Sequence, residues 1–200
     1  LKIFRSSSQT RGVLKNNEIQ CVSEDRLKHI WVGLHEGINI VDKESFRTTV
    51  FNNEFVNKDR INSILTDHDG YVWIATSSNG ILRVDPLTLK YDRYYNDSSS
   101  KLRLKSNSVI NLFEDHAGRI WFTSWRNGLG CISNNRDKLT YAPFIGSSNN
   151  PFRIYQEKNG TYWICTWGDG LFNMSIGKNN SMSLTPIKIA SSSYLKSVNN

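Results

Sequence analysis

The sequence has little of what marks a metal centre, a disulfide scaffold or a membrane anchor. Its 200 residues include only three cysteines, four prolines and four histidines. Cys21, Cys131 and Cys165 are not spaced as a CxxC pair, and an odd number of thiols cannot pair fully. No stretch approaches the roughly 18 apolar residues of a membrane helix. We therefore expect buried free thiols, no metal, no cofactor and no membrane insertion by this segment.

The charge is basic but not concentrated. There are 25 Lys and Arg against 18 Asp and Glu, which gives a net charge of +7. This balance indicates either a soluble basic surface or attraction to a polyanion such as an acidic polysaccharide. The densest patch, residues 101–105, holds three cations, and no nucleic-acid-binding motif is present. A nucleic-acid partner is not expected.

Tryptophan is plentiful, and four of the six residues recur in register. Trp31, Trp73, Trp121 and Trp163 are separated by 42, 48 and 42 residues. Such a period signals a propeller or a repeat array. The repeat also carries an acidic residue six positions before the tryptophan and, from the second copy on, a glycine three positions before it. The structural repeat residues are Trp31, Trp73, Trp121, Trp163, Gly70, Gly118, Gly160, Asp67 and Asp115.

Within one period, strand follows strand. The second copy alternates apolar and polar residues in short runs that are rich in β-branched and aromatic side chains, and glycine, asparagine or proline separates the runs. The strands expected there are 61–66, 71–75, 81–84 and 89–95. Four antiparallel strands in a meander make one propeller blade. We call them strands a, b, c and d.

The fold class expected is all-β, a β-propeller segment of four four-stranded antiparallel blades. The blades are expected at 18–51, 61–95, 107–145 and 152–190. Residues 1–5 resemble the outer strand of a preceding blade, and 191–200 resemble the approach to a next blade. We therefore expect an incomplete part of a seven-bladed propeller.

The repeat residues invite a search for chemistry, but their expected roles are architectural. The tryptophan fills the space between blades and needs one acceptor for its N–H. The acidic residue can cap the a–b turn, and the glycine supplies the turn geometry. The acidic and histidine groups 67–69 and 114–116 sit at the same offset in successive blades. We expect them to point away from one another, with no metal site and no catalytic residue.

Function is expected where the copies differ, on the face shared by the b–c turns and the d–a connections. Two tryptophans on tight exposed turns are costly to leave in water and could stack on a sugar ring. An arginine there could hold a carboxylate or sulfate in a bidentate manner. The alternative is that both indoles pack onto the neighbouring blade. The candidate ligand residues are Trp125, Arg126, Asn127, Trp167, Asp169, His35, Arg60 and Arg153.

The unit Ile-x-x-Ile/Leu-x-x-Asp-x-x-Gly-x-x-Trp-x-x-Thr-x-x-x-Gly-Leu/Ile resembles the two-component regulator propeller repeat. Residues 59–85 and 107–132 match it well, 152–174 slightly less, and 19–42 weakly, because Lys28 replaces the turn glycine. The resemblance implies the periplasmic sensor region of an inner-membrane hybrid histidine kinase of Bacteroides type. Such sensors bind oligosaccharides and regulate the transcription of glycan-use genes.

The resemblance also implies partners. These are an oligosaccharide ligand and the remaining propeller blades and sensor domains of the same chain, and a homodimer is left open. Two alternatives stay open for function. Residues 118–123 and 160–166 also resemble streptogramin-type lyase propellers, for which His35 is the only histidine on the ligand face. The other alternative is a protein-interaction propeller. No enzyme activity is expected of this segment itself.

Overall fold

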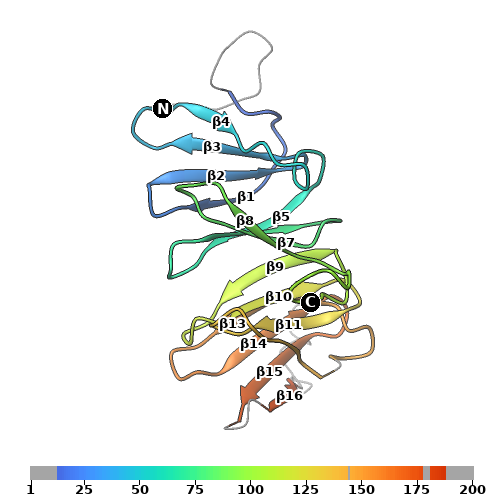
Figure 1. Cartoon of the computed structure of the whole chain (residues 1–200). Coiled ribbons are helices and arrows are strands. Elements are labelled where there is room, and N and C mark those ends of the chain that lie inside the picture. The colour runs from blue at the N-terminus through green and yellow to red at the C-terminus, as the bar shows by residue number, and fades with distance from the viewer. Residues whose placement is uncertain (1–12, 144, 178–180, 188–200) are drawn as a thin grey trace, which may run out of the picture.

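The computed structural model describes residues 13–143, 145–177 and 181–187, and within these ranges it contains strands and no helix. The strands form four separate four-stranded antiparallel sheets (Figure 1). The expected all-β fold of four four-stranded blades is confirmed. The segments 1–5 and 191–200, for which further strands were expected, lie outside the described residues.

Each sheet is a meander in chain order. The strands are, in the first sheet, β1 (Ile19–Glu24), β2 (His29–Leu34), β3 (Ile38–Asp42) and β4 (Thr48–Val50); in the second, β5 (Ile61–Thr66), β6 (Val72–Thr76), β7 (Ile81–Val84) and β8 (Tyr91–Tyr94); in the third, β9 (Val109–Glu114), β10 (Ile120–Ser124), β11 (Gly128–Ile132) and β12 (Leu139–Tyr141); and in the fourth, β13 (Pro151–Gln156), β14 (Tyr162–Thr166), β15 (Leu171–Ile176) and β16 (Met182–Pro186).

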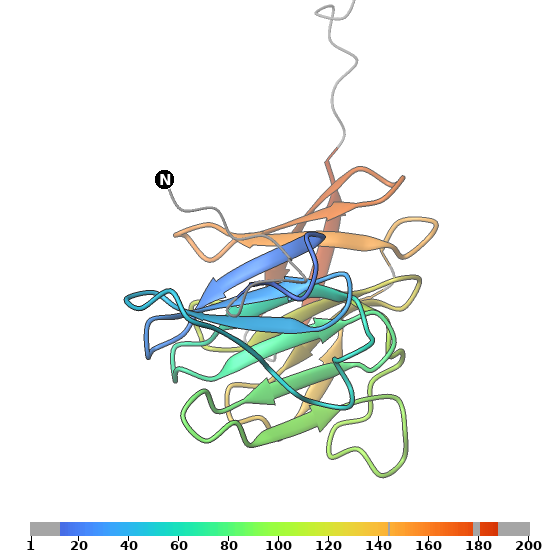
Figure 2. The ribbon, with the colours of Figure 1, turned by 90° about the horizontal axis from the view of Figure 1, so that it is seen from above.

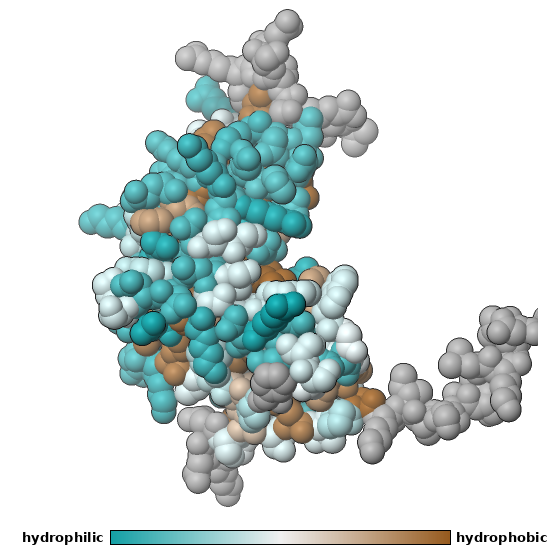
Figure 3. All heavy atoms as spheres, turned by 90° about the vertical axis from the view of Figure 1, so that its right-hand side faces the viewer, coloured by the Kyte–Doolittle hydropathy of each residue, from teal (hydrophilic) through white to brown (hydrophobic). Residues whose placement is uncertain are grey.

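The sheets follow one another as a stack, from the first at the top of Figure 1 to the fourth at the bottom. Seen along the stack in Figure 2, the strands of successive sheets run in different directions. The first strands of neighbouring sheets contact one another, β1 with β5, β5 with β9 and β9 with β13, and the second strand of each sheet also contacts the first strand of the next. The space-filling view in Figure 3 shows an arc that is hollowed along one side. The first strands therefore lie innermost, as in a propeller blade.

All four sheets share one pairing register. The second-strand tryptophan lies opposite Ser23, Leu65, Phe113 and Tyr155 of the respective first strands. A register shift also recurs at the same place near the start of every first strand, for example between Ile61 and Ser63. Equivalent positions can therefore be assigned from the backbone pairing as well as from the sequence motif.

The a–b turn explains why the first copy matches the repeat weakly. In the later copies a glycine sits there with positive φ, 84° at Gly70, 73° at Gly118 and 91° at Gly160. Lys28 occupies the same position in the first sheet and takes φ 64°. A residue with a Cβ is strained in this region. The first turn therefore has the same backbone geometry as the other three turns, but with a strained lysine in place of the glycine.

The outer strand of the second sheet is shorter than its sequence pattern suggested. Strand d of the second blade was expected at 89–95, but β8 spans Tyr91–Tyr94. The reason is that Leu89 takes φ 57° and still belongs to the c–d turn. Phe46 and Arg136 have φ 59° and 57° in the corresponding turns. A left-handed residue ends the turn and delays the strand.

Three hydrophobic cores lie between neighbouring sheets, and each is built in the same way. One sheet supplies its second-strand tryptophan, and Trp31, Trp73 and Trp121 are fully buried. The next sheet supplies the aliphatic residues of its first three strands, such as Ile64 and Ile74 opposite Trp31. The other two cores repeat this between the second and third sheets and between the third and fourth. Inter-sheet packing therefore holds the array together.

The acidic residue six positions before each tryptophan supplies the acceptor that its indole needs. Trp73 Nε1 donates to Asp67 Oδ2 at 2.7 Å, and Trp121 Nε1 donates to Asp115 Oδ2 at 2.7 Å. The other oxygen of Asp67 caps the turn by accepting from the Tyr71 amide at 2.8 Å. The spacing of six therefore serves the turn and the buried indole with one carboxylate.

The cysteines do not all behave as expected. Cys131 is buried and Cys21 half-buried, but Cys165 is exposed. The expectation of a buried thiol at Cys165 was wrong. Its equivalents, such as Ala75, are covered by the following sheet, whereas the fourth sheet is the last one that the structure describes.

Candidate functional site

The b–c turns and the d–a connections meet on one face, as the meander requires. The Ser77 amide in one b–c turn donates to the Arg60 carbonyl at 3.0 Å, and the Trp167 amide donates to the Asn150 carbonyl at 2.8 Å. The Gly80 amide donates to the Asn107 carbonyl at 2.9 Å, which ties the turn to the following connection. Side chains that are distant in sequence are thereby brought to one rim.

Two of the expected tryptophans lie together there. The ring centroids of Trp125 and Trp167 are 6.4 Å apart, with an interplanar angle of 59°. Phe152 joins them, its ring centroid 6.1 Å from that of Trp167 at 62°. Trp125 is 41% exposed and Trp167 is 63% exposed. The two indoles thus pack across neighbouring blades and still present open ring surface. We call Trp125, Phe152 and Trp167 the aromatic cluster.

Two arginines follow members of this cluster directly in the chain. Arg126 follows Trp125 in the turn, where its φ is 58° and its amide donates to Asn150 Oδ1 at 2.7 Å, and its side chain is exposed. The Arg153 guanidinium lies 5.4 Å from the centroid of the Phe152 ring. Asn127 Nδ2 donates to the Trp125 carbonyl at 2.9 Å, which stabilises the turn. The site combines aromatic surface with positive charge.

Asp169 is already engaged by the protein. Its two carboxylate oxygens accept from the amides of Ser147 and Ser148, at 3.0 and 3.1 Å, and from both hydroxyls, at 2.5 Å each. These hydrogen bonds, those of the serine hydroxyls above all, hold the pKa of Asp169 well below its usual value. Asp169 therefore orders the connection before the fourth sheet and keeps its charge paired with donors.

The remaining candidates lie in the first two sheets and contact other residues. His35 Nδ1 is 3.5 Å from Glu18 Oε2. Arg60 Nη2 donates to Gln20 Oε1 at 2.7 Å. The structure therefore brings together Trp125, Arg126, Asn127, Trp167 and Arg153, with Asp169 bound to the adjacent connection, and it places His35 and Arg60 elsewhere on the array.

Phe152 was not expected at the site. It sits at the register shift near the start of β13, between Pro151 and Arg153. Strict alternation does not fix the direction of a side chain at such a shift. No signal in the sequence pointed to Phe152, because the register shift that recurs once per copy becomes visible only when the strand pairing is known.

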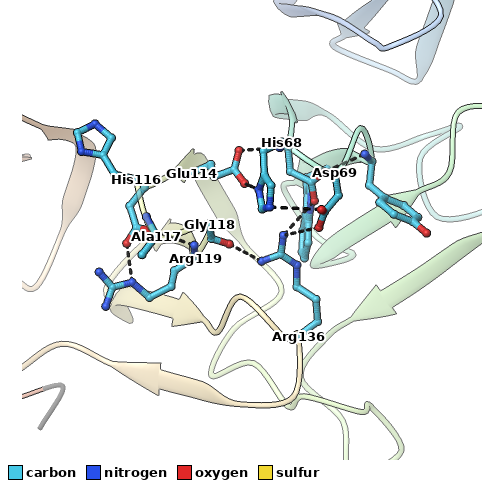
Figure 4. A network of polar contacts seen from close by, with 12 residues as sticks. His68, Asp69, Glu114, His116, Ala117, Gly118, Arg119 and Arg136 are labelled. Carbon is cyan, nitrogen blue, oxygen red and sulfur yellow. Dashed lines mark hydrogen bonds and ion pairs between the residues drawn. The ribbon is translucent and has the colours of Figure 1, made fainter. Parts of the chain in front are cut away.

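The opposite rim corrects another expectation. The groups 67–69 and 114–116 were expected to point away from one another, but the His68 amide donates to Glu114 Oε2 at 2.9 Å, and its ring nitrogen Nδ1 contacts Glu114 Oε1 (Figure 4). The a–b turn of one sheet lies beside the end of the next first strand, so non-equivalent positions meet. Hydrogen bonding to Glu114 raises the pKa of His68. Among the described residues, no group of three or more acidic, histidine or cysteine side chains could hold a metal ion.

The repeat carboxylates also join neighbouring sheets on this rim. Arg136 is buried, and it donates from Nη1 to the Gly118 carbonyl at 2.7 Å and from Nη2 to Asp67 Oδ2 at 3.1 Å (Figure 4). Tyr162 donates its hydroxyl to Asp115 Oδ2 at 2.8 Å. Burial acts to raise the pKa of Asp115, but hydrogen bonds from Trp121 and other donors outweigh it and lower that pKa. The carboxylates of Asp67 and Asp115 are therefore already hydrogen-bonded within the fold.

Comparison with known families identifies the repeat. The family model described as two component regulator propeller matches residues 56–78 and 103–126. No curated protein matches the chain in sequence. Among the described residues, no helix is long and apolar enough to cross a membrane.

Solved structures with the same fold include extracellular domains of hybrid two component systems. The extracellular domain of the hybrid two component system BT3049 from B. thetaiotaomicron is 23% identical, with a TM-score of 0.72 over 90% of this chain and 25% of that one. The corresponding domain of BT4673 is 19% identical, with a TM-score of 0.66 over 84% and 25%. Virginiamycin B lyase from Staphylococcus aureus is 16% identical, with a TM-score of 0.68 over 89% and 59%. At these identities the likeness shows the fold, and this chain spans about a quarter of the length of the two extracellular domains.

Proposed function

We propose that this chain, which carries two component regulator propeller repeats, is part of a ligand-sensing region and binds an oligosaccharide at the aromatic cluster. The whole protein would then be a hybrid sensor kinase of the inner membrane. This segment would lie on the periplasmic side, and the kinase would control the transcription of glycan-use genes. The likeness to extracellular domains of hybrid two component systems supports the setting. The exposed aromatic cluster carries the proposal of a ligand.

Ligand binding is proposed because the aromatic cluster is exposed although the fold does not require its exposure. Large aromatic side chains are normally buried or directed to partners, and an exposed cluster marks an interaction site. The apolar face of a pyranose ring can lie flat on an indole, and the 59° between the two tryptophan planes offers surfaces to more than one sugar unit. A chain of sugars fits this geometry better than a single sugar.

The charges beside the cluster favour an acidic ligand. The Arg153 guanidinium lies beside Phe152, and Arg126 follows Trp125 in the chain with an exposed side chain. Arginine binds carboxylate or sulfate in a bidentate manner. The nearby Asp169 carboxylate is paired with four donors from two serines, which lessens its repulsion of an anion. The net charge of +7 adds long-range attraction. We therefore favour uronic acid or sulfated oligosaccharides.

The contacts of His35 argue for binding rather than catalysis. A lyase needs an acid–base group beside the bound ligand. His35, the histidine considered for that role, contacts Glu18 in the first sheet, whereas the aromatic cluster belongs to the third and fourth sheets. The function proposed for this segment is therefore recognition.

Calorimetric titration tests the proposal. The chain is titrated with neutral and acidic oligosaccharides and with a panel of peptides, and a Trp125→Ala/Trp167→Ala variant is compared with Tyr155→Ala, which removes an exposed aromatic residue outside the cluster. We expect an acidic oligosaccharide to bind and the double variant to lose at least tenfold in affinity, equivalent to about 1.4 kcal/mol. Binding of peptides alone, or equal affinity in both variants, would overturn the proposal.

A further inference from the structure

The connection between the second and third sheets is longer than its counterparts. It comprises residues 95–108, whereas the other two connections between described sheets comprise only 51–60 and 142–150. All three are d–a connections and lie on the face that also carries the b–c turns. The longest of them therefore contains residues that the link between two blades does not require.

Within this connection, cations alternate with leucines. Lys101, Arg103 and Lys105 are exposed, whereas Leu102 and Leu104 are buried in the core between the second and third sheets. Because the leucines anchor the chain in that core, the three cations project away from it. A fully extended chain would place the first and the last cation at most about 14 Å apart. We call Lys101, Arg103 and Lys105 the basic strip.

Hydrogen bonds fix the backbone that carries the basic strip. The Lys105 amide donates to the Tyr141 hydroxyl at 2.8 Å. Asn96 joins the two ends of the connection, because its amide donates to Asn107 Oδ1 at 2.7 Å and its Nδ2 donates to the Lys105 carbonyl at 3.2 Å. A binding surface on a fixed backbone loses little conformational freedom when a ligand binds.

Neighbouring residues offset only part of the charge of the basic strip. No ion pair between described residues includes any of its three cations. Asp97 is the one acidic residue of the connection, and it accepts from the amide and the hydroxyl of Ser99 at 2.8 and 2.7 Å. By contrast, the two acidic and two basic residues of 51–60 balance, and 142–150 has no charged residue. An anionic partner would relieve the repulsion between the three cations.

We propose that the basic strip binds anionic groups of an acidic polysaccharide, as a second contact that is separate from the aromatic cluster. The choice of a polysaccharide rests on the proposed function, whereas the strip itself is identified by its charge and its fixed backbone. The strip and the aromatic cluster lie on the same face of the array. A ligand long enough to reach both contacts would therefore bind more tightly than a short one.

The surroundings of the basic strip favour a polysaccharide over other polyanions. Single-stranded nucleic acid is bound by aromatic rings on which bases stack. The two tyrosines beside the strip instead contact cations, at 4.1 and 4.2 Å from their ring centroids (Tyr95 with Arg93 and Tyr141 with Lys105). A membrane surface favours exposed apolar side chains, but both leucines of the connection are buried.

Binding of soluble polyanions tests the strip. The chain is titrated with dextran sulfate and with polygalacturonate at low and at high salt. Lys101→Ala/Arg103→Ala/Lys105→Ala is compared with Lys43→Ala/Lys90→Ala/Lys138→Ala, which removes exposed lysines from c–d turns on the opposite rim. Each variant removes three positive charges, so the comparison separates the position of the charges from their number.

The strip variant is expected to bind at least about tenfold more weakly at low salt, because three charge contacts act together. The control variant is expected to lose less than about threefold, through long-range attraction alone. In the unmodified chain, bound dextran sulfate is expected to protect Lys101 and Lys105 from acetylation but not Lys90, a measurement that needs no variant to fold.

Three results would overturn the proposal. They are the absence of binding by either polyanion, equal losses in the two variants without protection of Lys101 and Lys105, and tighter binding of single-stranded RNA or anionic lipid vesicles than of either polysaccharide. Trp125→Ala/Trp167→Ala retains the basic strip. Failure of the aromatic cluster as a ligand site is therefore distinguishable from failure of the strip.

Discussion

Removal of the Asp67 carboxylate is expected to destabilise the array far more than removal of any exposed charge. The side chain is fully buried and accepts from three groups, the Tyr71 amide at 2.8 Å, Trp73 Nε1 at 2.7 Å and Arg136 Nη2 at 3.1 Å. Asp67→Ala would leave the guanidinium of Arg136, itself almost wholly buried, without its nearest counter-charge. It would also leave a buried indole N–H unpaired.

The expected loss of stability follows from these two effects, the unpaired buried charge of Arg136 and the unpaired buried indole N–H. Breaking a buried ion pair by removing one partner costs about 3–5 kcal/mol, and an unsatisfied buried donor costs about 1–3 kcal/mol. Because the groups share one carboxylate, the terms do not add fully. We expect Asp67→Ala to lower the free energy of unfolding by about 3–5 kcal/mol, measured by guanidinium denaturation with tryptophan fluorescence.

Two controls make the test specific. Asp69 is 3.9 Å from Arg136 and about half exposed, so Asp69→Ala is expected to cost less than about 1 kcal/mol. Asp67→Ala/Arg136→Met removes both charges and is expected to be more stable than Asp67→Ala alone. A loss below 1 kcal/mol in Asp67→Ala, or a double variant that loses the sum of the two single changes, would refute the reasoning.

The other predictions concern a titrating pair, a turn and the thiols. Hydrogen bonding to Glu114 raises the pKa of His68. The contribution of His68 to stability is therefore fully present below the unfolded pKa of about 6.5 and is lost as pH rises through the folded pKa. His68→Gln should remove this part of the stability–pH profile, and an unchanged profile would count against the His68–Glu114 pair. Gly160 has φ 91° with no atom within 4 Å of a built Cβ, whereas a Cβ on Gly130 would meet Phe122 at 2.2 Å. Gly160→Ala should lower the free energy of unfolding by about 1–2 kcal/mol through backbone strain, and Gly130→Ala should lower it more. The reverse order in denaturation curves would contradict the close packing of Gly130 against Phe122. Burial raises the pKa of Cys21 to about 11 and of Cys131 to about 12, so a thiol reagent at pH 8 should label one site, Cys165, in the native chain and three after unfolding; native labelling of Cys131 would be inconsistent with its burial.

The architecture could be predicted from the sequence because the same sequence pattern recurs in each blade. The tryptophan period and the alternation recur in every copy, and the turn glycine recurs in all but the first, so a local ambiguity in one copy is resolved by the next. The outer-strand limits could not be predicted in the same way. Leu89 reads as a strand residue, but it takes φ 57° inside the turn, and nothing in its chemistry announces this.

The site was less accessible to sequence reasoning. The turns that carry Trp125 and Trp167 could be placed on one face, but their mutual packing depends on how the third and fourth sheets meet. Asp169 looked free to bind a ligand because the fold of the serine-rich connection that surrounds it is not encoded in any short pattern. His68 and Glu114 meet because adjacent blades are offset, an effect that alignment of equivalent positions conceals.

Nuclear magnetic resonance of the six indole N–H groups tests the ligand site most directly. The four repeat tryptophans donate to acidic residues, Trp31 to Asp25 and Trp163 to Glu157 among them, and their resonances should stay in place when an acidic oligosaccharide is added. Those of Trp125 and Trp167 should shift with a single saturating curve. Shifts confined to the four repeat tryptophans, or none with any oligosaccharide of the panel, would contradict the assignment of the aromatic cluster as the binding site.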